Sequence, residues 1–135
     1  MKNVLVCVTK QKSCDRLIRY GRELADGEGG ELFIVHIAHY AFKILGQEEE
    51  SDALEYLYQK SLEYGANLTI VRSNNVLATL VSLVGKHNIS KVVLGESREP
   101  KEKSMVEGFR QMVGDRVLLI IVPPEDDEEL DETVL

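Results

Sequence analysis

The strongest constraint on the fold is a regular alternation between two kinds of hydrophobic pattern along the chain. Short apolar runs, such as residues 92–94 and 118–121, show no polar residue at every second position. Runs of this kind are typical of strands that are buried on both faces, as in a parallel sheet covered by helices on both sides. Between the runs, apolar residues recur every three or four positions, which predicts amphipathic helices.

These patterns predict an alternating series of strands and helices, with the order βαβαβαβαβ. The expected strands are Asn3–Val8, Leu32–Ala38, Asn67–Arg72, and residues 91–94 and 116–122. The expected helices cover residues 14–25, 54–62, 76–84 and 105–113, with Ser13 as the N-cap of the first helix. Residues 46–51 and 95–104 are expected to be polar loops. The fold class is therefore α/β, with a doubly wound parallel sheet.

Length and charge predict one domain followed by an acidic tail. The chain has 135 residues and a net charge of −7, and seven of its acidic residues lie in residues 123–135. The remainder, residues 1–122, carries 16 acidic and 16 basic residues and is electrically neutral. Nucleic-acid binding requires a basic surface, so this balance argues against it. We expect residues 1–122 to form the α/β domain and residues 123–135 to be a solvated, flexible tail.

The sequence favours a cytoplasmic protein without a membrane partner. Its longest apolar run, residues 117–122, is far shorter than the roughly 20 residues that a membrane-spanning helix needs. The first residues lack the apolar core and cleavage site of a signal peptide. The two cysteines, Cys7 and Cys14, are expected to be reduced thiols.

The fold class restricts where a ligand can bind. In open parallel sheets, ligands bind at the carboxyl ends of the strands, near helix N-termini. The candidate segments are residues 9–14, 38–41, 73–75 and 95–103. Lys10, Lys12, Arg98 and Lys101 lie in these segments and suit a phosphate-bearing ligand. The alternative is that these charges pair with the neighbouring glutamates in two solvated loops.

Several short segments resemble the universal stress protein family. They are residues 4–8, the end of the second strand at residues 35–37, residues 92–95, and the last strand, residues 117–122. Together with the order and spacing of the elements, the resemblance covers residues 3–122. The sequence looks especially like the divergent branch that occurs as a domain in potassium-sensing histidine kinases.

The resemblance implies a three-layer, five-stranded sheet in the order 3-2-1-4-5. It also implies a phosphate loop of glycine, two residues, glycine, nine residues, and a glycine followed by Ser or Thr. Gly95 and Gly108 match the first and third glycines, but Arg98 replaces the second and Phe109 replaces the hydroxyl residue. Thr9 stands where the family has an aspartate. A side chain at position 98 obstructs close approach of the backbone to phosphate, so the usual ATP site is expected to be degenerate.

These considerations give a set of candidate ligand-binding residues around the loops that follow the first and fourth strands. They are Thr9, Lys10, Gln11, Lys12, Ile37, His39, Gly95, Arg98 and Gly108. The ligand implied by the resemblance is a nucleotide or another anionic small molecule, with a cyclic dinucleotide as one possibility.

We predict binding rather than catalysis. No nucleophile can be paired with a base, because His36 falls inside a strand, His39 stands alone at the ligand edge and His87 ends a helix. The cysteines and histidines lack the spacing of a metal site. The predicted function is a regulatory or stress-response binding module. The alternatives are a true ATP-binding or weakly hydrolysing member of the family, and a protein-interaction scaffold that uses the acidic tail.

The last strand predicts a homodimer. In the implied order it lies at a sheet edge, and it is strongly apolar with no interior proline or lysine to prevent edge pairing. We expect two copies to pair their last strands in antiparallel orientation across a two-fold axis. The expected interface residues are Val117, Leu118, Leu119, Ile120, Ile121 and Val122.

Overall fold

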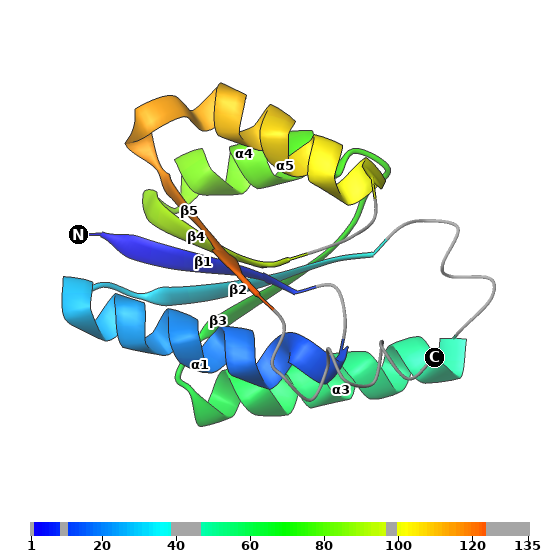
Figure 1. Ribbon diagram of the computed structural model, residues 1–135. Coiled ribbons are helices and arrows are strands. Elements are labelled where there is room, and N and C mark those ends of the chain that lie inside the picture. Colours follow the sequence, from blue (N-terminus) through cyan, green and yellow to red (C-terminus); the bar gives the residue numbers. More distant parts are fainter. Residues whose placement is uncertain (1, 9–10, 39–46, 97–99, 124–135) are drawn as a thin grey trace.

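One parallel sheet organises the molecule, with its five strands in the order β3-β2-β1-β4-β5 (Figure 1). The computed structural model describes residues 2–8, 11–38, 47–96 and 100–123. The strands are β1 (Asn3–Val8), β2 (Leu32–Ala38), β3 (Asn67–Arg72), β4 (Ile89–Gly95) and β5 (Leu118–Val122). The helices are α1 (Gln11–Glu28), α3 (Gln47–Glu63), α4 (Val76–Lys86) and α5 (Pro100–Val113), with a 3-10 helix, η1, at Gly114–Arg116. The predicted fold class and strand order are confirmed.

The sheet is the middle of three layers: α1 and α3 cover one face, and α4 and α5 cover the other (Figure 1). All six residues of β1 are buried, as expected for a central strand of a doubly covered sheet. Val4, Val6 and Val8 pack with the side chains of α1 and α3. Leu5 and Cys7 pack on the opposite face with residues of α4 and α5.

Several predicted boundaries are wrong, because polar segments expected as loops are helical. The first helix begins at Gln11, so Ser13 lies within it and is not its N-cap. Residues 47–51, expected in a loop, form the start of α3. Pro100 begins α5, so the loop before that helix is shorter than predicted. Gln, Glu and Lys favour helices, and proline is well suited to the first helical position, so polarity alone did not indicate a loop here.

Two strands also begin at residues other than those expected. The fourth strand starts at Ile89 rather than at residue 91, because Asn3 of β1 already pairs with Ile89. The fifth strand starts at Leu118, since Gly114–Arg116 forms the 3-10 helix.

Close contacts join the chain at the amino ends of the strands. The Asn3 side chain, which is buried, donates to the carbonyl oxygen of His87 at 2.8 Å and accepts from the backbone N–H of Glu31 at 2.9 Å. A Cβ atom on Gly30 would lie 1.8 Å from the Lys2 carbonyl oxygen, so this turn requires glycine. The buried polar groups at this edge are therefore used to join β1 to the two turns beside it.

Candidate functional site

The candidate site lies at the carboxyl ends of the parallel strands, opposite the end of the sheet that Asn3 closes. Strands β1 and β4 are neighbours, and Cys7 is paired with Leu94 next to their carboxyl ends. The order changes direction here, because α1 returns to one face and α5 to the other. This is the place in an open α/β sheet where ligand sites form.

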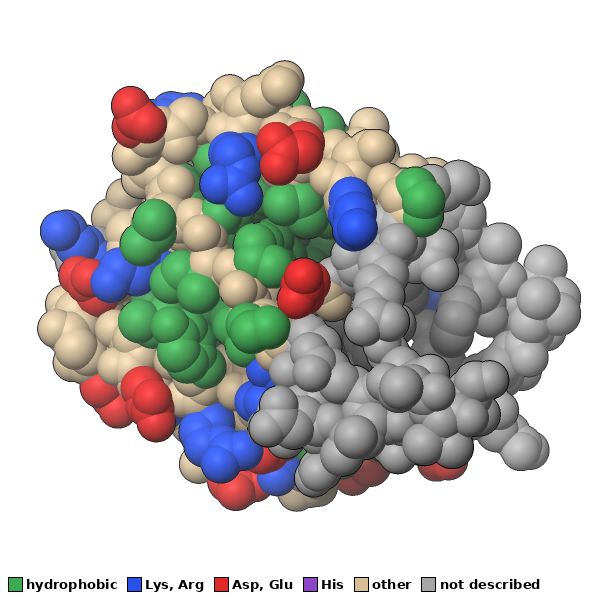
Figure 2. Space-filling view, viewed as in Figure 1, with side chains coloured by type: hydrophobic (Ala, Val, Ile, Leu, Met, Phe, Trp, Pro, Cys, Tyr) green, Lys and Arg blue, Asp and Glu red, His purple; other side chains and the backbone are tan. Residues whose placement is uncertain are grey.

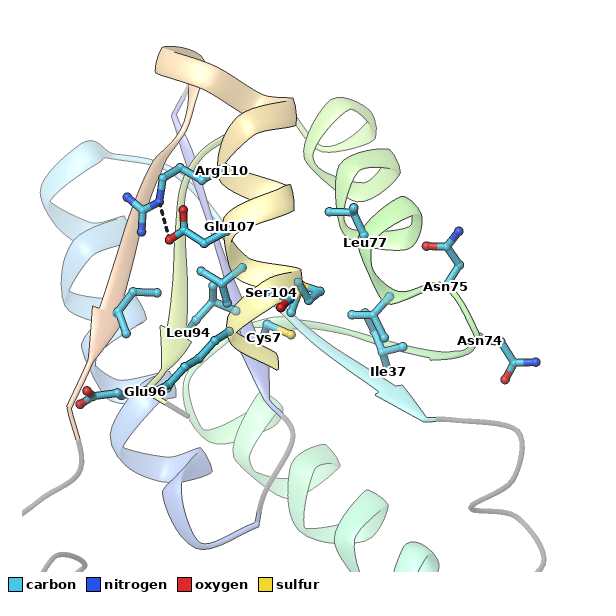
Figure 3. A pocket seen from close by; sticks show the side chains of 16 residues that line it. Cys7, Ile37, Asn74, Asn75, Leu77, Leu94, Glu96, Ser104, Glu107 and Arg110 are labelled. Atoms are coloured by element: carbon cyan, nitrogen blue, oxygen red, sulfur yellow. Dashed lines mark ion pairs between the residues drawn. The ribbon is translucent and has the colours of Figure 1, made fainter. Parts of the chain in front are cut away.

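A cavity of about 940 Å³ opens at this edge between the sheet and the helices α4 and α5 (Figure 3). Its apolar lining comes from all three elements and consists of Cys7, Ile37, Val76, Leu77, Leu94, Met105, Val106 and Ile121. Ligand sites are commonly apolar hollows of this size with a few polar groups at their margin. The remaining lining residues provide such a margin and are Asn74, Asn75, Gly95, Glu96, Lys103, Ser104, Glu107 and Arg110.

On the α4 side, the margin consists of neutral amides. The Asn75 side chain caps α4, because its Oδ1 accepts from the backbone N–H of Ala78 at 3.0 Å. Its backbone N–H in turn donates to the Ser73 Oγ at 3.0 Å, and the Thr79 hydroxyl also donates to that oxygen at 3.1 Å. These bonds fix the turn between β3 and α4, which holds the amides of Asn74 and Asn75 at the cavity.

On the α5 side, the margin is charged. Lys103, Glu107 and Arg110 lie at positions i, i+4 and i+7, so they form one stripe along the helix. The Arg110 Nε lies 3.8 Å from the Glu107 Oε1, and the two side chains are 51% and 68% exposed. An ion pair that is this long and exposed contributes little to stability, so Arg110 is available to another anion.

The structure brings two of the predicted ligand-binding residues into this cavity, Ile37 and Gly95. Gly108 is placed elsewhere: it lies within α5, where a Cβ atom on it would lie 3.3 Å from the Leu77 Cδ2. Its backbone N–H is inside the helix and is used by the helical hydrogen-bond pattern. Phe109 is fully buried, which confirms that this side chain belongs to the core.

The remaining candidates lie outside the described residues or in a helical turn whose backbone alone is described. Thr9, Lys10, His39 and Arg98 lie outside the described residues, as does the acidic tail beyond Pro123. Gln11 and Lys12 form the first turn of α1, where the structure describes the backbone alone.

Sequence reasoning did not single out the amides and the α5 stripe. Asn74 and Asn75 fall in one of the four candidate segments, but no chemistry was assigned to them. Arg110 lies in the predicted helix, three residues after Glu107, and the apolar spacing of that helix predicts only a face that packs on the core. The signal that could have found it is the polar stripe at residues 103, 107 and 110, which flanks the apolar side of the same helix.

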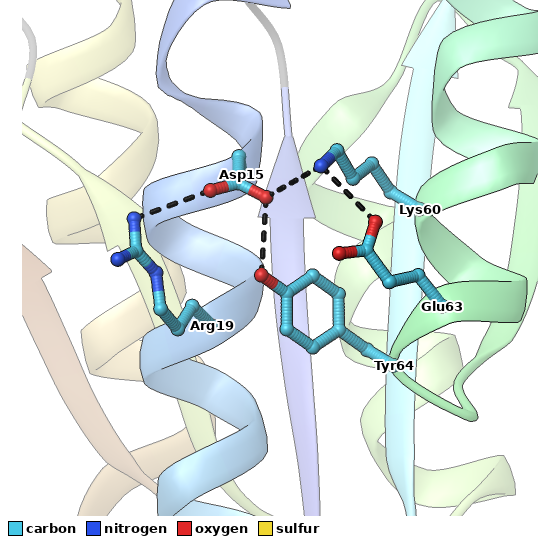
Figure 4. Close-up of polar contacts among 5 residues, drawn as sticks. All are labelled: Asp15, Arg19, Lys60, Glu63 and Tyr64. Atoms are coloured by element: carbon cyan, nitrogen blue, oxygen red, sulfur yellow. Dashed lines mark hydrogen bonds and ion pairs between the residues drawn. The ribbon is translucent and has the colours of Figure 1, made fainter.

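A second polar cluster, on the other face of the sheet, joins α1 to α3 (Figure 4). Asp15 accepts from Lys60 Nζ at 2.9 Å and from the Tyr64 hydroxyl at 3.1 Å, and it also pairs with Arg19 at 3.2 Å. The hydrogen bond from Lys60 is the main reason that the pKa of Asp15 is lowered. Desolvation is the main reason that the pKa of the Tyr64 hydroxyl is raised. The contacts of Asp15 lie within α1 or join α1 to the end of α3 and to Tyr64 directly after it, so the cluster is structural.

The two histidines in the described ranges, His36 and His87, make backbone and packing contacts. His36 is half-buried in β2, and its Nδ1 lies 3.1 Å from the carbonyl oxygen of Val8 in the neighbouring strand. His87 stacks on Phe33 with 4.4 Å between the ring centroids. Within the described ranges, no group of three or more His, Cys, Asp or Glu side chains is placed to hold a metal ion. None of the helices described is long and apolar enough to cross a membrane.

Comparison of sequences gives one partial relative. No protein-family model matches the chain. A protein of Synechocystis sp. that is named as a KdpD sensor protein is 24% identical over 110 residues. The match covers 79% of this chain and 28% of the relative, so the chain corresponds to less than a third of that protein.

Comparison of structures gives matches over nearly the whole chain. A universal stress protein from Burkholderia pseudomallei has a TM-score of 0.66 at 16% identity, covering 91% of this chain and 96% of the other. The universal stress protein of Archaeoglobus fulgidus in complex with dAMP has a TM-score of 0.56 at 17% identity, covering 90% and 98%.

The same fold also occurs as part of a larger enzyme. A class III photolyase from Agrobacterium tumefaciens matches with a TM-score of 0.71 at 19% identity, over 91% of this chain and 26% of the photolyase. A fold that serves different proteins does not fix the function, which has to be argued from the site. The predicted resemblance is nevertheless confirmed: this chain has the fold of the universal stress proteins, together with sequence similarity to a KdpD sensor protein.

Proposed function

We propose that this chain is a universal-stress-like regulatory module that binds a nucleotide in the cavity between α4 and α5. The observation that carries the proposal is the position of the cavity. It lies at the carboxyl ends of the strands and includes Ile37 and Gly95, which the sequence had singled out for ligand binding. Its apolar lining suits a nucleobase, and its polar margin suits a sugar and a phosphate. A relative of the same fold is described in complex with dAMP.

Three features support a binding mode that differs from the family's glycine loop. Gly108 lies within α5, so its N–H is used inside the helix. The hydroxyl residue expected after it is replaced by Phe109, which is buried in the core. The N–H of Glu96 donates to the Val122 carbonyl oxygen at 2.9 Å, so this donor is also used. We therefore propose that side chains hold the ligand where the family uses backbone N–H groups.

The proposal is tested by blocking the cavity without disturbing the core. Ser104 is an exposed residue of α5 at the margin, so Ser104→Trp adds an indole ring at the opening. Ser82 is an exposed residue of α4 that does not line the cavity, so Ser82→Trp is the matched control. Isothermal titration with adenosine and AMP is expected to detect binding to the parent and to Ser82→Trp, and at least tenfold weaker binding to Ser104→Trp.

Two outcomes would contradict this function. If isothermal titration detects no binding of adenosine or AMP at millimolar concentration, the alternative of a protein-interaction scaffold is favoured. Equal affinities for the parent and Ser104→Trp would place the ligand elsewhere on the molecule. Tight binding of ATP with magnesium would instead contradict the proposal that the usual phosphate loop is degenerate.

We also propose that two copies associate through β5. This strand lies at an edge of the sheet, and Leu118 is 56% exposed. Leu118, Ile120 and Val122 share the face of the sheet that α1 and α3 cover. Figure 2 shows hydrophobic side chains gathered over this part of the molecule. An exposed apolar edge favours pairing with another strand, and a second copy is the simplest partner.

The two edges of the sheet provide a matched test of this association. Ile120→Lys adds a charge to β5, whereas Ile70→Lys adds one to β3, the opposite edge, where Ile70 is 43% exposed. Analytical ultracentrifugation is expected to show dimers for the parent and for Ile70→Lys, and monomers for Ile120→Lys. A monomeric parent would exclude the dimer. A monomer produced by Ile70→Lys but not by Ile120→Lys would assign the interface to β3.

A further inference from the structure

The cavity has two chemically different ends. Figure 3 shows Asn74 and Asn75 on the α4 side, and Glu107, Arg110 and Glu96 on the side of α5 and β5. The α4 end therefore offers neutral groups that can both donate and accept hydrogen bonds, whereas the α5 end offers charges. Between them lie Leu77, Ile37 and Leu94, whose apolar surface can contact a flat ring.

The α4 end suits the edge of a nucleobase. A base carries donors and acceptors side by side, and an amide side chain can meet both with one group. Asn74 is an exposed residue that lines the cavity. Within the described residues, its side-chain amide makes no hydrogen bond that holds the fold. Asn75 has committed its Oδ1 to the cap of α4, which leaves its Nδ2 to donate.

The α5 end suits a phosphate. Arg110 presents a planar guanidinium group, which binds phosphate through paired hydrogen bonds. Its partner in the structure is the Glu107 carboxylate, 3.8 Å away, so Glu107 occupies the position of an anion without a close hydrogen bond. Lys103 belongs to the same stripe and lies about 10 Å closer to the amino end of the helix, at 1.5 Å per residue. It adds a second positive charge to this margin of the cavity.

From this polarity we infer an orientation of the ligand: the base of a nucleoside monophosphate lies at the α4 amides, and its phosphate displaces Glu107 from Arg110. This inference rests on the proposed nucleotide function and adds the residues that recognise each part. Arg110 and Asn74 are then specificity residues at opposite ends of one site. Glu107 acts as a competing anion that weakens phosphate binding until the ligand replaces it.

The orientation is tested by comparing AMP with adenosine, which lacks the phosphate. For the parent, isothermal titration is expected to give about tenfold tighter binding of AMP, as charged hydrogen bonds to arginine contribute at this level. Arg110→Gln is expected to abolish this preference without changing the affinity for adenosine. Glu107→Gln is expected to strengthen AMP binding several-fold, because it removes the competing carboxylate. Asn74→Ala is expected to weaken both ligands by a similar factor.

Arg19 provides the matched control. It is also an arginine on a helix, 56% exposed and paired with an acidic residue one turn earlier, Asp15, but it lies on the opposite face of the sheet. Arg19→Gln is expected to leave both affinities at the parent values. Circular dichroism and thermal melting of each variant establish that the fold is retained.

The outcomes separate this inference from the function on which it rests. If adenosine and AMP bind the parent equally, or if Arg110→Gln keeps the preference for AMP, the orientation is wrong while the nucleotide site stands. If neither ligand binds, both the orientation and the nucleotide function are wrong. If Arg19→Gln changes the preference as much as Arg110→Gln does, the effect is general electrostatics, and the assignment of Arg110 is overturned.

Discussion

The two faces of the sheet differ in how their helices meet. On one face, α1 and α3 are joined by Asp15, Lys60 and Tyr64, with the Asp15–Lys60 contact at 2.9 Å. On the other face, α4 and α5 enclose a cavity of about 940 Å³ at the carboxyl ends of the strands. The same sheet therefore supports one closed layer, which stabilises the fold, and one open layer, which can receive a ligand.

Both faces also contain fully packed helix residues. Leu57 of α3 is 2% exposed, and Leu80 of α4 and Phe109 of α5 are fully buried. The layer of α4 and α5 therefore has a packed region around Leu80 and Phe109 beside the cavity. A cavity can thus form at one end of a pair of helices while the core beside it stays packed.

The largest expected difference between the faces concerns leucine truncation. Leu57→Ala removes a fully packed side chain from the closed face, and we expect it to lower the free energy of unfolding by about 2–5 kcal/mol. Leu77 is half-buried and faces the cavity, so Leu77→Ala is expected to cost only about 1 kcal/mol. Urea denaturation of both variants measures the contrast. Equal costs would mean that the cavity is packed in solution.

A smaller contrast is expected from two helical glycines. A Cβ atom on Gly21 would lie 2.3 Å from the Val6 Cγ2, between α1 and the sheet, so Gly21→Ala is expected to destabilise the fold by about 1–3 kcal/mol. At Gly108 the nearest atom is the Leu77 Cδ2 at 3.3 Å, beside the cavity, where a leucine side chain can move. Gly108→Ala is then expected to stabilise α5 by up to about 1 kcal/mol through helix propensity.

Thermal melting gives the sign of each change directly. The midpoint is expected to fall for Gly21→Ala and to stay constant or rise for Gly108→Ala. A fall of similar size in both variants would show that α5 approaches α4 as tightly as α1 approaches the sheet.

The smallest expected effect is a pH dependence that belongs to the closed face. The pKa of Asp15 is lowered in the folded state, chiefly by the hydrogen bond from Lys60. A lowered pKa means that the folded state favours the carboxylate, so Asp15 stabilises the fold above the ordinary carboxyl pKa near 4 and loses this effect as the pH falls further. The difference in urea midpoint between the parent and Asp15→Asn should therefore shrink on acidification from pH 7.

Comparing the parent with Asp15→Asn at each pH separates the effect of Asp15 from that of other carboxylates. The pKa of Glu28 is also lowered, chiefly by its hydrogen bond from Lys91, so the parent and Asp15→Asn share that contribution and it cancels. A midpoint difference that is constant from pH 7 to pH 3 would show that the Asp15 cluster does not hold α1 to α3.

The fold could be predicted largely from the sequence because buried parallel strands leave an unambiguous pattern. Runs such as residues 92–94 are apolar on both faces, and the structure places Val92 and Val93 in the cores on opposite faces of β4. The strand order followed from the resemblance to a family. Helix starts were less predictable, since Pro100 and the polar residues after it suit both a loop and a first helical turn.

The candidate site was predictable where it depends on strand ends and not where it depends on the packing of helices. Ile37 and Gly95 lie at the ends of β2 and β4, so fold class alone points to them. The apolar spacing of α5 predicted a packed face, but the structure divides it: Phe109 is buried, whereas Met105 lines the cavity. A period of 3.6 residues identifies the inner face of a helix and cannot tell a packed core from a hollow, which is why Arg110 was missed.

The central claim, that the open face holds the ligand, is tested most directly by an NMR titration of the amide resonances with AMP. The claim predicts that shifts concentrate on the cavity, including Leu77, Gly95 and Ser104, while Asp15 and Lys60 on the closed face keep their positions. Shifts centred on Asp15 and Lys60, or no shifts at millimolar AMP, would contradict the claim.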